Sequence, residues 1–187
     1  MRPGRCFLFL LALSAAAALR AQELSAQARV ISLAATAPST LSVTVTSGAS
    51  QTIAAVTDNA TNSFPSPVVI QTNWDVNPGQ TNSMNLVAYF TIPAQAMVGG
   101  TTQIPSNRIL GRMVTGAPTT FTAMNQNGIG GVGTAGGSLL LFSQVITGAN
   151  KSATRTDNLD LQLNLVGFPT LLPGSYTGVL NLRMVTQ

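Results

Sequence analysis

Apolar and polar residues alternate along most of this chain, which is the pattern of half-buried strands. The clearest example is 159–165, where every odd residue is leucine and the residues between them are polar. Alternating or apolar runs that end at turn residues predict further strands at 41–46, 68–74, 84–91, 139–146 and 176–186. Weaker patterns predict strands at 28–34, 51–57, 108–115 and 119–124, and a short helical turn at 94–97.

About eight to ten short strands with turns between them predict an all-β domain, and specifically a β-sandwich with Greek-key connections. The 139–146 run is expected to be buried on both faces, and the last strand places Leu180, Leu182 and Met184 on one side. We predict one sandwich domain over residues 38–187.

Three features of the predicted domain have plain structural interpretations. Trp74 and Phe142 lie in apolar strand patterns, so we expect core positions for them in preference to a sugar-binding platform. Residues 154–157 are expected to form a solvated turn before the leucine-rich strand. The glycine-rich stretch 125–138 is expected to be a mobile surface loop.

The start of the chain has the order of a secretory signal peptide. Arg2 and Arg5 precede an apolar run at 6–13, and small residues lead to a cleavage site that we place after Ala21. A buried helix or a membrane anchor is the alternative, but the run has only about half to two-thirds of the length of a spanning helix. We therefore predict a signal peptide over 1–21 and an exported protein at the cell surface, extracellular or periplasmic.

Export changes the interpretation of the charge. The chain has nine Lys and Arg against five Asp and Glu, but Arg2, Arg5 and Arg20 lie in the predicted signal peptide. The remaining six basic residues nearly balance the acidic ones, so we expect neither nucleic acid as a partner nor a stable membrane span. Cys6 leaves with the signal, and stability must come from burial and strand pairing without a disulfide.

The composition argues against catalysis. The chain has no histidine and no cysteine besides Cys6, so the usual nucleophile and base pairs and the commonest metal ligands are missing. Asp157 and Asp160 are three residues apart, which places them on opposite faces of a strand. We predict a non-enzymatic protein without catalytic residues, cofactor or metal.

Two short motifs resemble ligand-binding patterns, one for a dinucleotide and one for calcium. Residues 128–133 satisfy G-x-G-x-x-G, with Asp157 further on, but a dinucleotide site needs a helix after the glycines and a β-rich run follows here. We therefore expect a hairpin loop. Residues 75–79 begin like a calcium loop, yet Gln80 and Leu86 stand where glycine and glutamate are needed, which favours an Asx turn.

The two ends of the predicted domain suggest a family. The stretch 26–37 (AQARVISLAATA) leads into 41–45 (LSVTV), and the chain closes with 173–182 (PGSYTGVLNL). These stretches resemble bacterial pilin-like secreted proteins of the spore coat U and archaic chaperone-usher pilin type, and related uncharacterised domains. The resemblance covers roughly 25 residues after the predicted cleavage site and the last 15 residues.

The resemblance implies an incomplete immunoglobulin-like sandwich. In such proteins the N-terminal segment of one subunit fills the groove of its neighbour by β-strand addition. The implied donor segment is 22–37, and the implied donor residues are Leu24, Ala26, Ala28 and Val30. The implied partners are like subunits in a homopolymer and a periplasmic chaperone. Two departures are the missing cysteines and a donor face made mostly of alanine.

Two functional hypotheses follow. The first is a structural subunit of a surface filament or coat, of the fimbrial type, that assembles by donated strands. The second is a self-contained secreted sandwich that binds a polysaccharide or a matrix protein through its loops, with adhesion as its role. In the second case 22–37 is the first strand of a complete sandwich or a tail.

Overall fold

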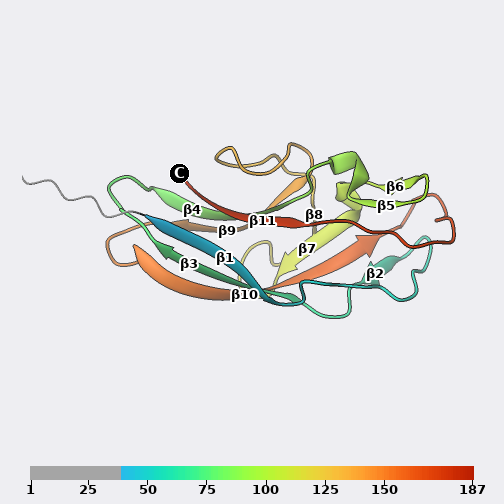
Figure 1. Cartoon of the computed structure of the whole chain (residues 1–187), viewed down its shortest axis with the longest axis horizontal. Helices are drawn as coiled ribbons and strands as arrows, with labels where there is room; N and C mark the ends of the chain where they lie inside the picture. Colours follow the sequence, from blue (N-terminus) through green and yellow to red (C-terminus); the bar gives the residue numbers. More distant parts are fainter. Residues whose placement is uncertain (1–38) are drawn as a thin grey trace, which may run out of the picture. The chain divides into compact units, whose positions relative to one another are not determined.

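A computed structural model describes residues 39–187 of the chain (Figure 1). The predicted signal peptide 1–21, the segment 22–37 and the weak strand at 28–34 lie outside the described residues. The strands are β1 (Thr40–Ser47), β2 (Thr61–Ser63), β3 (Val68–Asp75), β4 (Ser83–Tyr89), β5 (Met97–Gly99), β6 (Thr102–Ile104), β7 (Ile109–Met113), β8 (Thr122–Ala123), β9 (Ser138–Val145), β10 (Ser152–Asn164) and β11 (Asn181–Thr186). Two 3-10 turns, η1 (Pro93–Gln95) and η2 (Ser106–Arg108), complete the elements.

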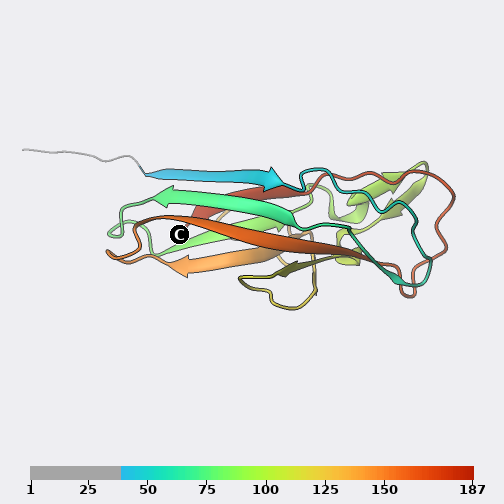
Figure 2. The same ribbon diagram turned by 90° about the horizontal axis from the view of Figure 1, so that it is seen from below.

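These strands form two antiparallel sheets that face each other across one core (Figures 1 and 2). The larger sheet has the order β1-β3-β10-β7-β8, and β2 pairs with the end of β10. The smaller sheet has the order β11-β4-β9, and β5 and β6 form a separate hairpin. The predicted all-β fold is confirmed, whereas the immunoglobulin-like Greek-key connectivity stays a prediction.

The core follows from the alternation in the sequence. Leu159, Leu161 and Leu163 on the inner face of β10 are buried, and so is Leu165 just after the strand. Burial of a leucine side chain contributes roughly 1.5–3 kcal/mol relative to exposure, so this row anchors the larger sheet. The smaller sheet contributes buried residues from β4 and β9 to the same cluster. In both of these strands parts of both faces are buried, as predicted for 139–146.

The structure corrects the weaker strand predictions. Residues 51–57 form no strand, and the Thr57 amide donates instead to the side-chain Oδ1 of Asn62 on β2, at 2.7 Å. The 108–115 and 119–124 patterns become β7 and the two-residue β8, and the helical turn lies at η1. The short strands β2, β5 and β6 have no clear alternation and were not predicted. No helix within 39–187 is long and apolar enough to cross a bilayer.

Candidate functional site

The two sheets end in strands that lie next to each other without pairing. β1 is the last strand of the larger sheet and β11 is the last strand of the smaller one. Each pairs with one neighbour, β1 with β3 and β11 with β4. Within residues 39–187, no strand pairs with the other edge of either. A free strand edge presents unpaired N–H and C=O groups that can pair with another chain.

The side chains between these two strands are apolar and only partly covered. On β1, Val43 and Val45 pack against the core, while Leu41 is 38% exposed. On the other side, Leu182 and the preceding Leu180 are half-buried. We call this region between β1 and β11, with the apolar side chains on its two margins, the open side.

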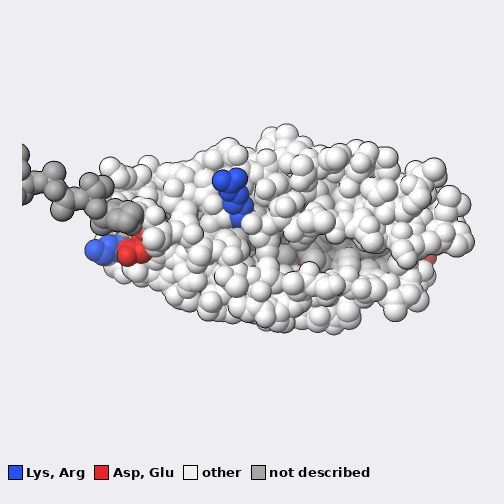
Figure 3. All heavy atoms as spheres, in the orientation of Figure 1, with Lys and Arg blue, Asp and Glu red and all other residues white. Residues whose placement is uncertain are grey.

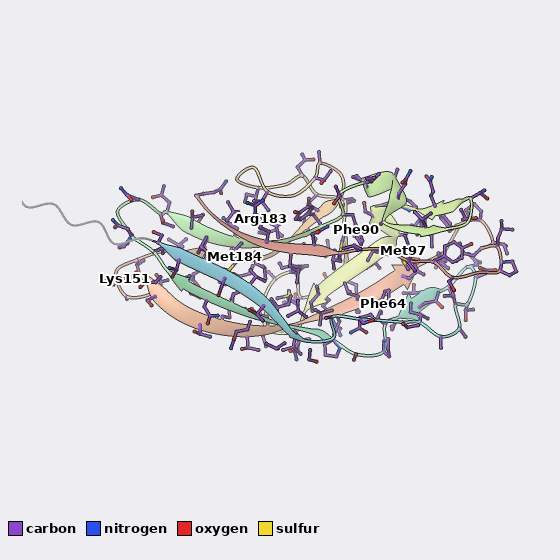
Figure 4. All side chains as sticks on the ribbon, viewed as in Figure 1. Phe64, Phe90, Met97, Lys151, Arg183 and Met184 are labelled. Carbon is purple, nitrogen blue, oxygen red and sulfur yellow. The ribbon has the colours of Figure 1, made fainter. Side chains whose placement is uncertain are left out.

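The open side widens away from the start of β1. In Figure 1, β1 and β11 converge where β1 begins and separate toward the other end, and the surface in Figure 3 is hollowed between them. Met184 is a buried residue of β11, and Phe64 and Met97 lie toward the wider end (Figure 4). Arg183 is exposed and projects from β11 (Figures 3 and 4). The side chains that line the opening are therefore apolar, and Arg183 lies beside it on β11.

The segment before β11 is fixed by close packing. The Tyr176 hydroxyl donates to the Leu172 carbonyl at 2.9 Å, and the Tyr176 ring lies so close to Gly99 that a Cβ there would be 2.7 Å from it. A Cβ at Gly178 would overlap the carbonyl oxygen of Ala96, so glycine is needed at this crossing. The P-G-x-Y-x-G stretch thus brings the chain into β11 along a defined path.

The opposite side of the sandwich is closed by an ion pair. Asp157 is 1% exposed, and Arg155 Nε and Nη2 donate to its two carboxylate oxygens at 2.5 and 2.7 Å. Thr115 Oγ1 donates to the same carboxylate at 2.7 Å, and the Arg155 guanidinium lies 4.3 Å from the ring centroid of Phe142 in the facing sheet. The predicted solvated turn at 154–157 is therefore wrong, because these residues belong to β10 and the charged groups satisfy each other.

The glycine-rich segment is a folded hairpin. Ile129 and Val132 exchange backbone hydrogen bonds, with Gly130 and Gly131 at positive φ between them, and Val132 is buried. Gly130 lies against the side chain of Val185 on β11. The predicted hairpin is confirmed, and most of its residues are exposed, as expected of a surface loop, whereas its mobility stays a prediction. β9 follows the glycines where the dinucleotide fingerprint requires a helix.

The remaining candidates have structural roles. The Gly79 amide donates to Asn77 Oδ1 at 3.0 Å, which confirms the Asx turn. Trp74 is buried and its indole donates to the Asn150 carbonyl at 2.9 Å, with Phe142 packed 6.1 Å away, centroid to centroid. Both aromatic residues are in the core, as predicted.

The acidic residues of β10 lie on opposite faces, as predicted from their spacing. Asp157 points inward, and Asp160 pairs with Arg112 at 2.6 Å across the outer face of the larger sheet. A depression of about 230 Å³ beside this pair is lined by Arg112, Met113, Val114 and Thr119. The Arg112 guanidinium is engaged by Asp160 and by the Phe121 ring, 4.5 Å away. In the part of the chain with described coordinates, no cluster of acidic side chains could hold a metal ion.

The predicted donor residues Leu24, Ala26, Ala28 and Val30 lie outside the described residues. The apolar opening that would receive such residues was implied only by the resemblance of the chain ends. Alternation marks β1 and β11 as strands, but it does not show that they are the edges of two different sheets. No protein-family model, no curated protein and no solved structure matches this chain.

Proposed function

We propose that this chain is a non-enzymatic structural subunit of a surface filament or coat, exported across the membrane and assembled by β-strand addition. The segment 22–37 of one copy occupies the open side of the next. One observation carries the proposal: two sheet edges, β1 and β11, face each other unpaired over half-buried apolar side chains. An added strand pairs with these backbone groups and covers the apolar margin.

The length of the N-terminal segment is sufficient for this role. Residues 22–38 precede the described domain, and an extended chain rises about 3.3 Å per residue. The segment therefore reaches about 55 Å, against about 27 Å for an eight-residue strand such as β1. An inserted strand of that length leaves roughly half of the segment as a link between two copies.

The composition of the segment suits a shallow opening. Leu24, Ala26, Ala28 and Val30 share one face of an extended strand, and two of the four are alanine. The apolar side chains on the margins, such as Val45 and Leu182, are already partly covered. Small donor side chains fit against such a surface without deep pockets. A donor face made mostly of alanine is therefore compatible with strand addition at this site.

A free apolar edge is a hazard before assembly. Long unpaired edges promote uncontrolled pairing, and few charged side chains on this face oppose it (Figure 3). A periplasmic chaperone that covers β11 and the open side until the next copy arrives would remove the hazard. We therefore include such a chaperone among the proposed partners, beside like subunits.

The test compares chains that begin at residue 22 and at residue 38. The longer chain is expected to polymerise, and the shorter one to stay monomeric and to bind a synthetic 22–37 peptide. Size-exclusion chromatography and electron microscopy measure the first property, and calorimetric titration measures the second.

Matched peptide variants test the face of the donor strand. Ala26→Asp with Ala28→Asp places charges in the open side and should abolish binding. Ser25→Asp with Gln27→Asp adds the same charges to the outward face and should leave affinity within a few fold. Equal loss from both pairs, or two equally stable monomers without peptide binding, would reject donor-strand assembly and favour the self-contained sandwich.

A further inference from the structure

One end of the sandwich gathers segments that are far apart in the sequence. It is the end opposite the start of β1, and it holds the β5–β6 hairpin and the loops before β2 and β11 (Figures 1 and 2). The Gly167 amide donates to Asn59 Oδ1 at 2.9 Å, and the Leu171 amide donates to Asp58 Oδ1 at 3.3 Å. Val98 and Thr177 exchange backbone hydrogen bonds. These contacts join the loops into one surface.

This end carries most of the exposed large apolar side chains of the described domain. Val179 is 74% exposed and Leu172 is 59% exposed. We call five side chains on these joined loops the distal patch: Val56, Val98, Val166, Leu172 and Val179. Nine large apolar residues within 39–187 are exposed in total, so five of them lie at one end. A concentration of exposed apolar groups is typical of an interaction surface.

The distal patch is held in a fixed conformation. Val98 is paired to the segment that carries Val179, and Gly178 crosses closely over Ala96. The Tyr176 hydroxyl donates to the carbonyl of Leu172 itself. Backbone segments held in this way lose little further conformational entropy on contact, which favours binding.

The place where the chain enters the domain indicates the occupant. β1 begins at the opposite end, so the segment 22–38 enters the domain there, and the open side widens toward the distal patch (Figure 1). A donor segment that enters the wide end of the opening brings the β1-start end of its own domain against the distal patch of the receiving copy. That end exposes Val145, 66% exposed at the end of β9.

We propose that the distal patch is a second contact between successive copies of this chain and meets the end that carries Val145 and the start of β1. The contact rests on the proposed function, because the donated strand sets the order of the copies. Tethering by that strand raises the effective concentration of the two ends, so a small apolar contact is sufficient. It fixes the angle between subunits that the linker alone would leave free.

The first experiment uses the chain that begins at residue 22. Val179→Lys with Leu172→Lys should raise the critical concentration for polymerisation about tenfold, equivalent to about 1.4 kcal/mol per contact. Val114→Lys is the control, since Val114 is 56% exposed and lies outside the distal patch. Thermal unfolding of the monomers should be nearly unchanged for all three substitutions, because each site is exposed.

The second experiment detects the contact itself. Because Cys6 is the only cysteine and lies in the predicted signal peptide, introduced cysteines in this chain stand alone. Val179→Cys with Val145→Cys should give ladders of covalent oligomers with a short bismaleimide, whereas Val114→Cys with Val145→Cys should not. Polymers that form normally but show neither the ladder nor the lysine effect would overturn the distal contact and leave donor-strand assembly intact. A chain that forms no polymer overturns both.

Discussion

The two long sides of this sandwich differ in how the gap between the sheets is closed. On the β9 side, the buried Asp157 pairs with the partly exposed Arg155 beneath Phe142, and Gln126 exchanges backbone hydrogen bonds with Ser138 at the start of β9. Side chains and the segment around Gln126 thus cover the gap between the sheets on this side, although within residues 39–187 most of the outer β9 edge is also unpaired. On the β1 and β11 side, two free strand edges lie next to each other over apolar side chains.

The two sides also differ in where this chain, which has few charged residues, places its charged groups. Arg155, Asp157, Arg112 and Asp160 form two ion pairs on β10 and its neighbours, on the inner and outer faces of the larger sheet. The open side has apolar margins, and the exposed Arg183 lies beside it on β11 (Figure 4). An edge that pairs with another chain must avoid buried unpaired charge, since such charge costs several kcal/mol.

The largest expected difference is between the unfolding free energies lost when a leucine on β9 and a leucine on β11 are each replaced by alanine. Leu141 on β9 is fully buried, so Leu141→Ala should lower the free energy of unfolding by about 2–5 kcal/mol. Leu182 on β11 is half-buried, so Leu182→Ala should cost only about 1 kcal/mol in the monomer. Urea denaturation of chains that begin at residue 38 measures both. Equal costs would mean that the β11 side is as closed as the β9 side.

The next largest effect is the difference in stability lost when each of the two ion pairs is broken. Asp157→Ala leaves Arg155 and Thr115 without their buried acceptor and should cost about 3 kcal/mol. Asp160→Ala removes a partner from Arg112, whose side chain is 40% exposed, and should cost less than about 1 kcal/mol. The same denaturation curves measure both changes. A small effect at Asp157 would show that the ion pair does not close the β9 side.

Local patterns were sufficient to predict the main strands. The leucine alternation of 159–165 identified β10, although the strand begins earlier, at Ser152. The solvated turn predicted at 154–157 failed because a charged residue in a strand can point inward when its partner is two residues away on the same face. Arg155 and Asp157 have that spacing, and only the neighbouring loop with Thr115 completes the cluster.

The open side could not be derived from the pattern alone. β1 pairs with β3, and β3 with β10, which is far away in the sequence, so sheet order depends on contacts that no local signal records. The ends of the chain gave the only hint, through their resemblance to pilin-like proteins. The short strands β2 and β5 could not be predicted for a related reason, since three residues contain too little alternation to detect.

Hydrogen exchange on β11 tests the central claim most directly. In the monomeric chain that begins at residue 38, β11 amides that point away from β4 have no strand partner and should exchange rapidly. In polymers of the chain that begins at residue 22, the same amides should be protected about a hundredfold or more, while β9 amides change little. Polymers in which the outward β11 amides exchange as fast as in the monomer would contradict assembly by a donated strand.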